Sequence, residues 1–394
     1  MQSRKTALLI SCFDWYEDRL KPIRDILIDK GYCVTVVTSD FLHINKQYIG
    51  KKNNECIYVH VPSYKNNISI QRIISHLLFG FKTNLIIKKS KPNLIYLLLP
   101  PNNTAIYCAR YVSQNTRCKY IVDLVDLWPE SMPIGWISHT LPAKVWASFR
   151  DNSIRKADQV LLECSYYKEK LVTYFPEIVD KISILRLFKY QSVEERKKVL
   201  NTIKQYEEER LNRPHKIILG YLGSINNIID IDKICEIVKK INNNGLCVEV
   251  RIIGDGQSRE EFVERLKDSG AETHFYGKIF NQAEKIKILG MCDYGLNIML
   301  DSVSVGLTIK SIDYFSMGLP ILNNIKGDTY EMVNEFRIGL NVNDNNFYEK
   351  LKTTLINRFH IHNIFETYFS KKSFNKTLEK IINRICPANE GNEE

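Results

Sequence analysis

Residues 301–320 join a glycine-bearing loop to a predicted helix that carries one basic and one acidic side chain. Gly306 and Thr308 precede the helix, and Lys310 and Asp313 lie in its first two turns. The free N–H groups and the positive dipole end of a helix start favour an anion such as a phosphate group. Lys310 would add a mobile cation, and Asp313 could accept hydrogen bonds from a ribose diol. The structural alternative is a solvated Lys310–Asp313 pair on the helix surface.

Two glycine-bearing turns come earlier in the second half of the chain. Gly223 and Ser224 end one apolar run, and Gly254 and Gly256 end the next. Glycine lets the backbone approach a ligand closely, so these turns are candidates for the other walls of an anion site. The alternative is structural, because a tight glycine turn is also a common way for a strand to meet a helix.

Two aspartates in the first half follow an apolar run, in Val122-Asp123-Leu-Val-Asp126-Leu-Trp-Pro-Glu130. An acid at the carboxyl end of a strand faces the place where α/β domains bind ligands, and there it could orient or deprotonate a hydroxyl group. We favour Asp126 for this role, with Asp123 as its competitor and loop capping as the structural alternative. Asp14 and Glu130 are expected to shape the same side.

The formal net charge of +10 lies wholly in the first half of the chain. Residues 1–190 contain 27 Lys and Arg against 16 Asp and Glu, whereas residues 191–394 contain 28 against 29. No acid occurs between Glu55 and Asp123. This asymmetry indicates an anionic partner, such as a membrane or a phosphorylated substrate, or else a solvated basic face. Nucleic acid is disfavoured, because no reader motif is present.

Residues 68–82 combine an apolar stripe with bases, which is typical of a helix that lies on an anionic membrane surface. The bases expected on the membrane side are Lys82, Lys88, Lys89 and Lys91. The alternative is a helix that packs on a sheet while its bases reach solvent. No apolar run is long enough to span a membrane. We therefore expect a cytoplasmic protein, peripheral at most on the inner face of the cell membrane.

Short apolar runs alternate with longer helical patterns along all 394 residues, whose length favours two domains and whose ordinary composition excludes a disordered or fibrous chain. The predicted strands are 6–12, 33–38, 56–61, 94–99, 119–124, 158–163 and 182–187, then 217–222, 247–253, 273–276, 293–298 and 319–322. These runs are continuous rather than alternating, as in parallel sheets covered on both faces. The pattern predicts an α/β fold of two doubly wound Rossmann-like domains facing a cleft.

The domain boundaries follow from where this alternation stops and restarts. We expect an N-terminal domain over 1–190, an exposed linker with one helix over 191–214, and a second domain over 215–360. The C-terminal helices over 361–394 are expected to pack back on the first domain. The ten cysteines lack paired spacing and the eight histidines lack metal-ligand spacing, so we expect buried thiols and neither a metal nor another cofactor.

Four motifs follow one another in the second half: Gly220-Tyr-Leu-Gly-Ser224, Ile253-Gly-Asp-Gly256, His274-Phe-Tyr-Gly277 and the run from Lys310 to Pro320. In this order they make the chain resemble a GT-B glycosyltransferase, most like glycosyltransferase family 4. The run Asp126-Leu-Trp-Pro-Glu-Ser131 also resembles members that assemble bacterial polysaccharides such as capsule and O-antigen. The resemblance covers nearly the whole chain.

This resemblance implies a metal-independent, retaining transfer from a nucleotide sugar to a growing saccharide acceptor, often one linked to a lipid diphosphate. The donor site would then comprise Gly223, Ser224, Gly254, Gly256, Tyr276, Val305, Gly306, Leu307, Thr308, Lys310 and Asp313. Asp313 stands where the family has the acid that binds the nucleotide ribose. Val305 replaces the Glu that usually contacts the donor sugar. The basic pair often found after Gly223 is also missing, which leaves Lys310 as the cation for the diphosphate.

Two other functions stay open on the sequence alone. The replacement of Glu by Val305 is compatible with a non-catalytic, glycosyltransferase-like partner subunit. A nucleotide-sugar epimerase on the same two-domain fold would turn over a donor without an acceptor, but it has no need for a basic first half.

Overall fold

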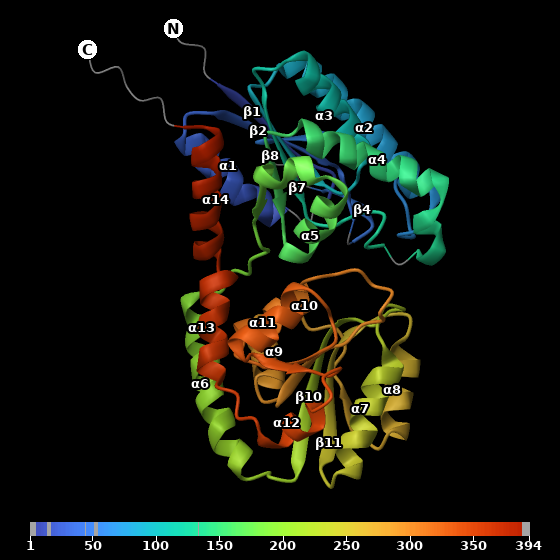
Figure 1. Cartoon of the computed structure of the whole chain (residues 1–394), viewed down its shortest axis with the longest axis vertical. Coiled ribbons are helices and arrows are strands. Elements are labelled where there is room, and N and C mark those ends of the chain that lie inside the picture. Colours follow the sequence, from blue (N-terminus) through green and yellow to red (C-terminus); the bar gives the residue numbers. More distant parts are fainter. Residues whose placement is uncertain (1–4, 14–16, 44, 51–53, 133, 388–394) are drawn as a thin grey trace, which may run out of the picture. The chain divides into compact units, whose positions relative to one another are not determined.

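The computed structural model describes residues 5–13, 17–43, 45–50, 54–132 and 134–387. The chain divides into two compact units, and each contains one parallel sheet with helices (Figure 1). Unit 1 comprises residues 1–185 and 375–394, and unit 2 comprises residues 186–374. Asp14, expected on the acceptor side, lies outside the described residues.

Unit 1 is built on a seven-stranded parallel sheet in the order β5-β2-β1-β6-β7-β8-β9. Its strands are β1 (Thr6–Ser11), β2 (Cys33–Ser39), β5 (Cys56–Val59), β6 (Leu94–Leu99), β7 (Lys119–Leu124), β8 (Gln159–Leu162) and β9 (Ile182–Ile184). Its helices are α1 (Glu17–Asp29), α2 (Ile70–Ser90), α3 (Asn103–Gln114), η2 (Gly135–His139), α4 (Leu141–Lys156), α5 (Ser165–Tyr174) and η3 (Pro176–Lys181). A short antiparallel pair, β3 (Phe41–Leu42) and β4 (Gln47–Tyr48), stands apart from the sheet.

Unit 2 repeats this plan with a six-stranded parallel sheet in the order β12-β11-β10-β13-β14-β15. Its strands are β10 (Lys216–Ser224), β11 (Cys247–Asp255), β12 (Glu272–Phe275), β13 (Tyr294–Asn297), β14 (Ile321–Asn323) and β15 (Gly339–Asn341). Its helices are α6 (Val193–Leu211), α7 (Ile231–Asn243), α8 (Arg259–Asp268), α9 (Gln282–Leu289), α10 (Ile309–Ser316), α11 (Asp328–Phe336), α12 (Phe347–Thr353) and α13 (Arg358–Tyr368).

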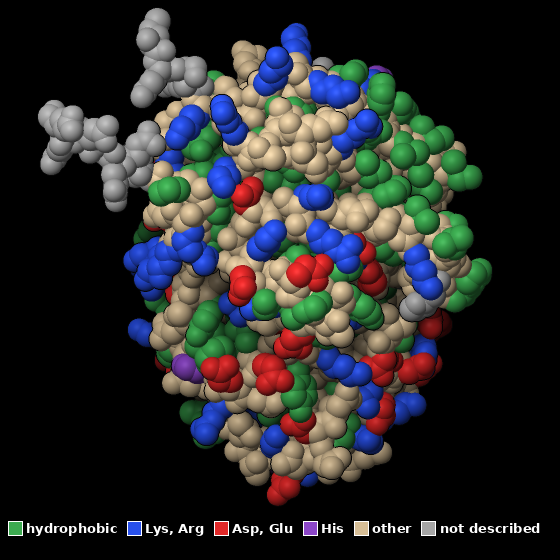
Figure 2. All heavy atoms as spheres, turned by 45° about the horizontal axis from the view of Figure 1, so that its top comes forward, with side chains coloured by type: hydrophobic (Ala, Val, Ile, Leu, Met, Phe, Trp, Pro, Cys, Tyr) green, Lys and Arg blue, Asp and Glu red, His purple; other side chains and the backbone are tan. Residues whose placement is uncertain are grey.

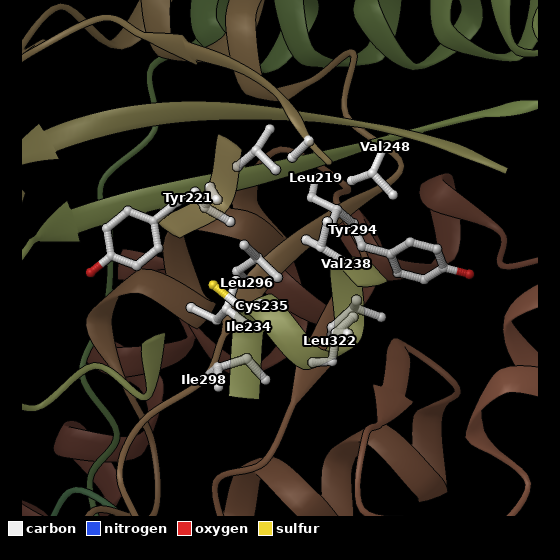
Figure 3. Packing of buried hydrophobic residues seen from close by; sticks show 14 of the residues in the cluster. Leu219, Tyr221, Ile234, Cys235, Val238, Val248, Tyr294, Leu296, Ile298 and Leu322 are labelled. Carbon is white, nitrogen blue, oxygen red and sulfur yellow. The ribbon is translucent and has the colours of Figure 1, made fainter. Parts of the chain in front are cut away.

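The α/β fold class and every predicted strand are confirmed. The strands could be predicted because their residues are buried and therefore apolar. All six residues of β6 are buried, as expected for a strand covered on both faces. In unit 2 the apolar side of α7, with Ile234 and Val238, packs on Leu219, Leu296 and other strand residues (Figure 3). Strand β15 and the β3–β4 pair were not predicted, because β15 has only one large apolar residue and β3 and β4 have only two residues each.

The stretch 191–214, predicted as an exposed linker with one helix, is mostly helix α6 and belongs to unit 2. The helix begins at a capping box, in which Ser192 Oγ accepts from Glu195 N (3.1 Å) and Glu195 Oε2 accepts from Ser192 N (2.8 Å). Two apolar residues in this polar helix, Val199 and Ile203, are fully buried. These residues pack α6 into unit 2, and the boundary between the units lies earlier in the chain, between Leu185 and Arg186.

The last helix, α14 (Lys371–Ile385), starts in unit 2, and from Asn375 onward its residues belong to unit 1. There Leu378 and Ile382 are fully buried, and Tyr32 lies with its hydroxyl 3.3 Å from Sγ of Cys386. Across the described ranges, no helix has both the length and the apolar character needed to cross a bilayer.

Candidate functional site

Helix α10 begins at Thr308, whose side chain caps the first turn. Thr308 Oγ1 accepts a hydrogen bond from Ser311 N (3.2 Å) and donates one to Asn297 Oδ1 (2.8 Å). Thr308 and Ser311 are both buried. This threonine therefore fixes the helix start against the end of β13.

A ladder of asparagines continues this chain of hydrogen bonds across the sheet. Asn297, Asn323 and Asn341 are the last residues of β13, β14 and β15, and they lie in register. Asn297 Nδ2 donates to Asn323 Oδ1 (2.9 Å), and Asn323 Nδ2 donates to Asn341 Oδ1 (2.8 Å). All three side chains are buried, so each amide depends on its neighbours for hydrogen bonds. The sequence analysis missed them, although Asn297 and Asn323 stand at or just after the ends of two successive apolar runs.

The loop before α10 is held from its other side by α11. The carbonyl oxygen of Gly306 accepts hydrogen bonds from Thr329 N (2.9 Å) and Thr329 Oγ1 (2.8 Å). Leu307 is buried, whereas Val305 is partly exposed. The predicted loop residues thus form one anchored segment. The side chain of Val305 has no group that could hydrogen-bond to a sugar.

Tyr314 ties α10 to the point where β10 and β13 separate. Its hydroxyl accepts from Leu222 N (2.8 Å) and donates to Gly220 O (3.2 Å). A Cβ on Gly295 would come within 2.7 Å of the Tyr314 ring, so only glycine permits this approach. Helix α10 is consequently held at the carboxyl ends of both strands, where α/β folds bind ligands.

Lys310 extends from the first turn of α10 to the end of β10. Its Nζ lies 4.9 Å from the centroid of the Tyr221 ring, and the Tyr221 hydroxyl donates to Ser224 O (2.8 Å). The structure therefore brings Lys310 close to the Gly223–Ser224 turn. Burial lowers the pKa of Lys310 to about 8, and an anion beside Nζ would raise it again.

Asp313 does not pair with Lys310, contrary to the solvated-pair alternative. Its carboxylate forms an ion pair with Lys189, and the same ammonium group donates to Ser316 Oγ (3.2 Å). Lys285 of α9 lies near this pair. Burial lowers the pKa of Lys285, the charge of Asp313 opposes that shift, and the charge of Lys189 adds to it. Asp313 thus sits between basic groups that the sequence analysis did not connect with it.

Gly223, Gly254 and Gly256, the predicted glycines of the two turns, are needed for different physical reasons. A Cβ on Gly254 would lie 1.9 Å from Gly223 O, and one on Gly256 would lie 2.0 Å from Ile225 O. These two glycines are therefore required for the close packing of neighbouring turns. Gly223 differs, because its φ is +128° and nothing lies within 4 Å of a Cβ built there. Tyr276, the remaining predicted donor residue, is exposed in the turn after β12.

Asp123 and Asp126, the competing aspartates of unit 1, have different surroundings. Asp123 is fully buried and pairs with Arg19 through Nε (2.7 Å) and a second nitrogen (2.9 Å), while the Tyr96 hydroxyl donates to it (2.5 Å). Burial acts to lower the pKa of Arg19, but the Asp123 carboxylate holds it above its usual value. Asp123 is therefore part of a structural ion pair. Asp126 is partly exposed just beyond β7.

Two residues after Asp126, Trp128 belongs to a group of aromatic rings that loops and helix α2 place around one guanidinium group. We call Phe13, His43, Tyr64, Arg72, His76 and Trp128 the Trp128 cluster. The Arg72 guanidinium lies 4.8 Å from the Trp128 ring centroid and 5.8 Å from that of Tyr64. Burial, reinforced by the charge of Arg72, lowers the pKa of His43 to about 3 and that of His76 well below its ordinary value. Both histidines are therefore neutral near pH 7.

The remaining residues predicted on the acceptor side have the following positions. Glu130 is held by the buried Arg150 through two hydrogen bonds of 2.7 and 2.9 Å. Lys82 donates to His60 O (2.7 Å), which directs it to the backbone of unit 1. Lys88 and Lys89 are exposed in the last turn of α2, and Lys91 caps that helix in a left-handed conformation.

One cluster in unit 2 has the composition of a metal site. Ligand atoms of Glu249, Glu272 and His274 lie within 4.8 Å of one another. Lys216 Nζ, however, lies 2.6 Å from Glu249 and 2.8 Å from Glu272, and Arg251 pairs with Glu249 at 2.6 Å. The cluster is therefore an ion-pair network, whose carboxylates already have cationic partners.

Comparison with known proteins agrees with this geometry. Residues 216–357 match a family model described as Glycosyl transferases group 1, and this segment contains the entire predicted donor site. No curated protein matches the sequence. Among solved structures, sucrose-phosphate synthase from Thermosynechococcus elongatus is 11% identical with a TM-score of 0.68, over 97% of this chain and 99% of that chain.

Two similar structures belong to lipopolysaccharide enzymes. The outer core galactosyltransferase WaaB is 11% identical with a TM-score of 0.64, over 96% of this chain and 99% of that chain. WaaG, a glycosyltransferase involved in lipopolysaccharide biosynthesis, is 13% identical with a TM-score of 0.59, over 97% of this chain and 100% of that chain. The chain has the GT-B fold. At these identities the likeness concerns the fold, and the activity is argued from the site.

Proposed function

We propose that the chain is a glycosyltransferase that moves a sugar from a nucleotide-activated donor to a saccharide acceptor. The observation that carries this proposal is the position of Lys310, which is desolvated beside the Gly223 turn at the capped start of α10. A helix start with a poorly hydrated lysine suits a diphosphate. The match of residues 216–357 to group 1 glycosyltransferases supports the same assignment.

In this proposal the diphosphate of the donor lies at the start of α10. Lys310 and the N–H groups there stabilise the charge that develops on the diphosphate as the bond from the sugar anomeric carbon to its oxygen breaks. A hydroxyl oxygen of the acceptor forms the new bond to that carbon, and its proton passes to the departing phosphate or to a base. Asp313 accepts hydrogen bonds from the ribose, and Asp126 orients the acceptor hydroxyl or takes its proton.

The finer assignments belong to the same proposal. Transfer proceeds with retention, as in glycosyltransferase family 4, and the acceptor is a growing bacterial polysaccharide of the capsule or O-antigen type on a lipid diphosphate. The acid-free stretch between Glu55 and Asp123 supports an anionic, membrane-bound acceptor. Two structural neighbours are described as lipopolysaccharide enzymes, which is in keeping with this choice. The chain would then act as a peripheral protein at the cytoplasmic face of the membrane.

The first test is a panel of nucleotides and nucleotide sugars screened by thermal shift. A true donor raises the melting temperature by mass action, and Lys310→Ala and Asp313→Ala should reduce that rise. Transfer to saccharide acceptors is then measured with the donors that bind. If no nucleotide or nucleotide sugar shifts the melting temperature at millimolar concentration, the assignment of the donor site to residues 301–320 is wrong.

A second candidate is a non-catalytic partner subunit, and the partly exposed Val305 in the donor loop is the observation that favours it. Donor binding without turnover, together with stable association with a partner enzyme, would distinguish it. A nucleotide-sugar epimerase would instead convert the donor with no acceptor present, which product analysis of the same reactions would detect.

A further inference from the structure

Helix α2 presents a row of large apolar side chains to solvent. Its members recur every three or four residues, and each is at least 44% exposed. They are Ile70, Ile73, Ile74, Leu77, Phe81 and Leu85, which we call the α2 stripe. A different side of the helix packs on the rest of unit 1, where Phe79, Thr83 and Ile87 are fully buried. The stripe is thus apolar surface beyond what the fold of unit 1 uses.

A second exposed apolar group lies on η2 and at the start of α4. Trp136 is 76% exposed and Leu141 is 74% exposed, and they are accompanied by Ile137 and Val145. We call these four residues the Trp136 group.

The helices that carry the stripe and the group are linked through the ring of Trp128. The Trp128 ring lies 6.2 Å from His76 of α2 and 5.7 Å from Trp146 of α4. Trp146 Nε1 also donates to Asn103 at the start of α3 (2.7 Å). The N-terminal halves of α2, α3 and α4 are therefore neighbours. Hydrophobic side chains gather on the side of unit 1 that α2 and α4 occupy (Figure 2).

The segments that carry these residues contain bases and no acids. No Asp or Glu occurs from 56 to 122, which includes α2 and α3, or from 131 to 149, which includes η2 and the first half of α4. Exposed bases accompany both sets of apolar residues: Lys88 and Lys89 follow the α2 stripe, and Lys144 lies between Leu141 and Val145. The nearest acid to η2 in the sequence, Glu130, is already paired with Arg150. An apolar surface accompanied by exposed lysines is complementary to a bilayer with anionic headgroups.

The side chains themselves also favour lipid over a protein partner. Protein interfaces rely on Tyr and Arg anchors and on paired charges, whereas the α2 stripe consists of five aliphatic residues and one Phe. Trp136 adds an exposed indole ring, an amphipathic group that is favoured between headgroups and acyl chains.

We propose that the α2 stripe and the Trp136 group together insert into the interfacial layer of an anionic lipid bilayer. Lys88, Lys89 and Lys144 then contact the lipid phosphates. This inference deepens the membrane association in the proposed function. It assigns most of the binding to apolar side chains, with the lysines contributing selectivity for anionic lipid. It also brings the Trp128 cluster and Asp126 close to the headgroup layer, within reach of an acceptor that is anchored in the membrane.

The test is sedimentation of the full chain with phosphatidylcholine vesicles that contain phosphatidylglycerol. A variant with Ile73→Ser, Leu77→Ser, Trp136→Ser and Leu141→Ser should bind at least about a hundredfold more weakly, because each lost side chain contributes roughly tenfold or more when buried. The matched control carries Val193→Ser, Leu211→Ser and Leu355→Ser. These three apolar residues of unit 2 are 86, 81 and 99% exposed, and their replacement should leave vesicle binding unchanged.

A variant without two of the lysines distinguishes the contribution of charge to vesicle binding from that of apolar insertion. Lys88→Gln with Lys89→Gln should weaken binding about tenfold on anionic vesicles and hardly at all on pure phosphatidylcholine. A second readout is tryptophan emission with lipids brominated on their acyl chains. These lipids should quench the wild-type chain, and Trp136→Phe should remove most of that quenching while it preserves binding.

The outcomes separate this inference from the proposed function. If the wild-type chain does not bind anionic vesicles, both the membrane association and this surface assignment are wrong. If the serine variant binds as well as wild type, only the surface assignment is wrong. If the serine variant loses self-association instead of vesicle binding, the surface is an interface between two copies of the chain, and the surface assignment is again wrong. The nucleotide donor should raise the melting temperature of the serine variant as much as that of the wild-type chain. This result would show that the variant is folded and that donor binding does not depend on the membrane surface.

Discussion

The ammonium group of Lys189 is paired with the carboxylate of Asp313, the side chain that we assign to the nucleotide ribose. The two side chains are 18 and 19% exposed, so the pair is largely withdrawn from water. A ribose that binds Asp313 must either share its carboxylate with Lys189 or displace Lys189 from it. Because Lys189 also donates to Ser316 Oγ, it can stay attached to α10 if Asp313 turns to a ligand.

Replacement of Asp313 by Asn should weaken binding of the nucleoside diphosphate about ten- to hundredfold, because a charge-assisted hydrogen bond to the ribose is lost. The measurement is titration calorimetry. The informative control is Lys189→Gln, which removes the competing cation but leaves the Asp313 carboxylate in place. Its affinity should equal or exceed that of the wild-type chain. An equal loss in both variants would mean that the ion pair acts only in the structure of unit 2.

The affinity for a diphosphate should fall as the pH rises through about 8. Burial lowers the pKa of Lys310 to about 8, and only the protonated side chain attracts the anion. Above that pH, binding must take up a proton, so the dissociation constant should rise by up to about tenfold per pH unit. Lys310→Arg should bind without this dependence, since arginine stays protonated. An unchanged pH profile in Lys310→Arg would show that another group titrates.

Replacement of Asn323 by Ala should destabilise unit 2 by about 2–3 kcal/mol, because the buried atoms Asn297 Nδ2 and Asn341 Oδ1 lose the hydrogen bonds that they make with Asn323. Urea unfolding measures this loss. Nucleotide affinity should fall as well, since Asn297 holds Thr308. Asn212→Ala, at the exposed end of α6, is the matched control and should change neither quantity.

Unit 1 should lose stability as the pH falls below about 6.5. Burial lowers the pKa of His43 to about 3, so the unfolded chain binds a proton that the folded chain does not. At pH 5 this difference amounts to roughly 2 kcal/mol, and the lowered pKa of His76 acts in the same direction. His43→Gln should reduce the acid sensitivity.

Tryptophan emission during urea unfolding at pH 7 and pH 5 measures this effect. All four tryptophans, Trp15, Trp128, Trp136 and Trp146, occur within the first 146 residues, so their emission reports on unit 1. The same loss of stability in His43→Gln and in the wild-type chain would assign the acid sensitivity to other groups.

Local pattern predicted the two sheets well, because buried parallel strands such as β6 are written as continuous apolar runs. It failed where the decisive contacts are tertiary. Strand β15 has only one large apolar residue, Leu340, so Asn341 could not be recognised as the end of a strand. Lys189 lies 124 residues from Asp313, and nothing local marks the two as partners.

The acceptor side shows the same limit. The Trp128 cluster combines residues of helix α2 with residues of loops far apart in the sequence, and it forms only once the sheet of unit 1 has brought these segments together. The sequence pattern predicted an apolar stripe on α2. It could not predict that the stripe is exposed, because the sequence does not say which side of an amphipathic helix a sheet will cover.

The asparagine ladder links correct strand pairing to the loop before α10, which we assign to the donor. A slip of one residue in β13, β14 or β15 would turn its asparagine to the opposite face of the sheet and break the chain of amides that ends at Thr308. Strands of three or four residues have little else to define their alignment. Thr308, and with it the start of α10, is therefore fixed against the sheet only when β13, β14 and β15 have been assembled in register.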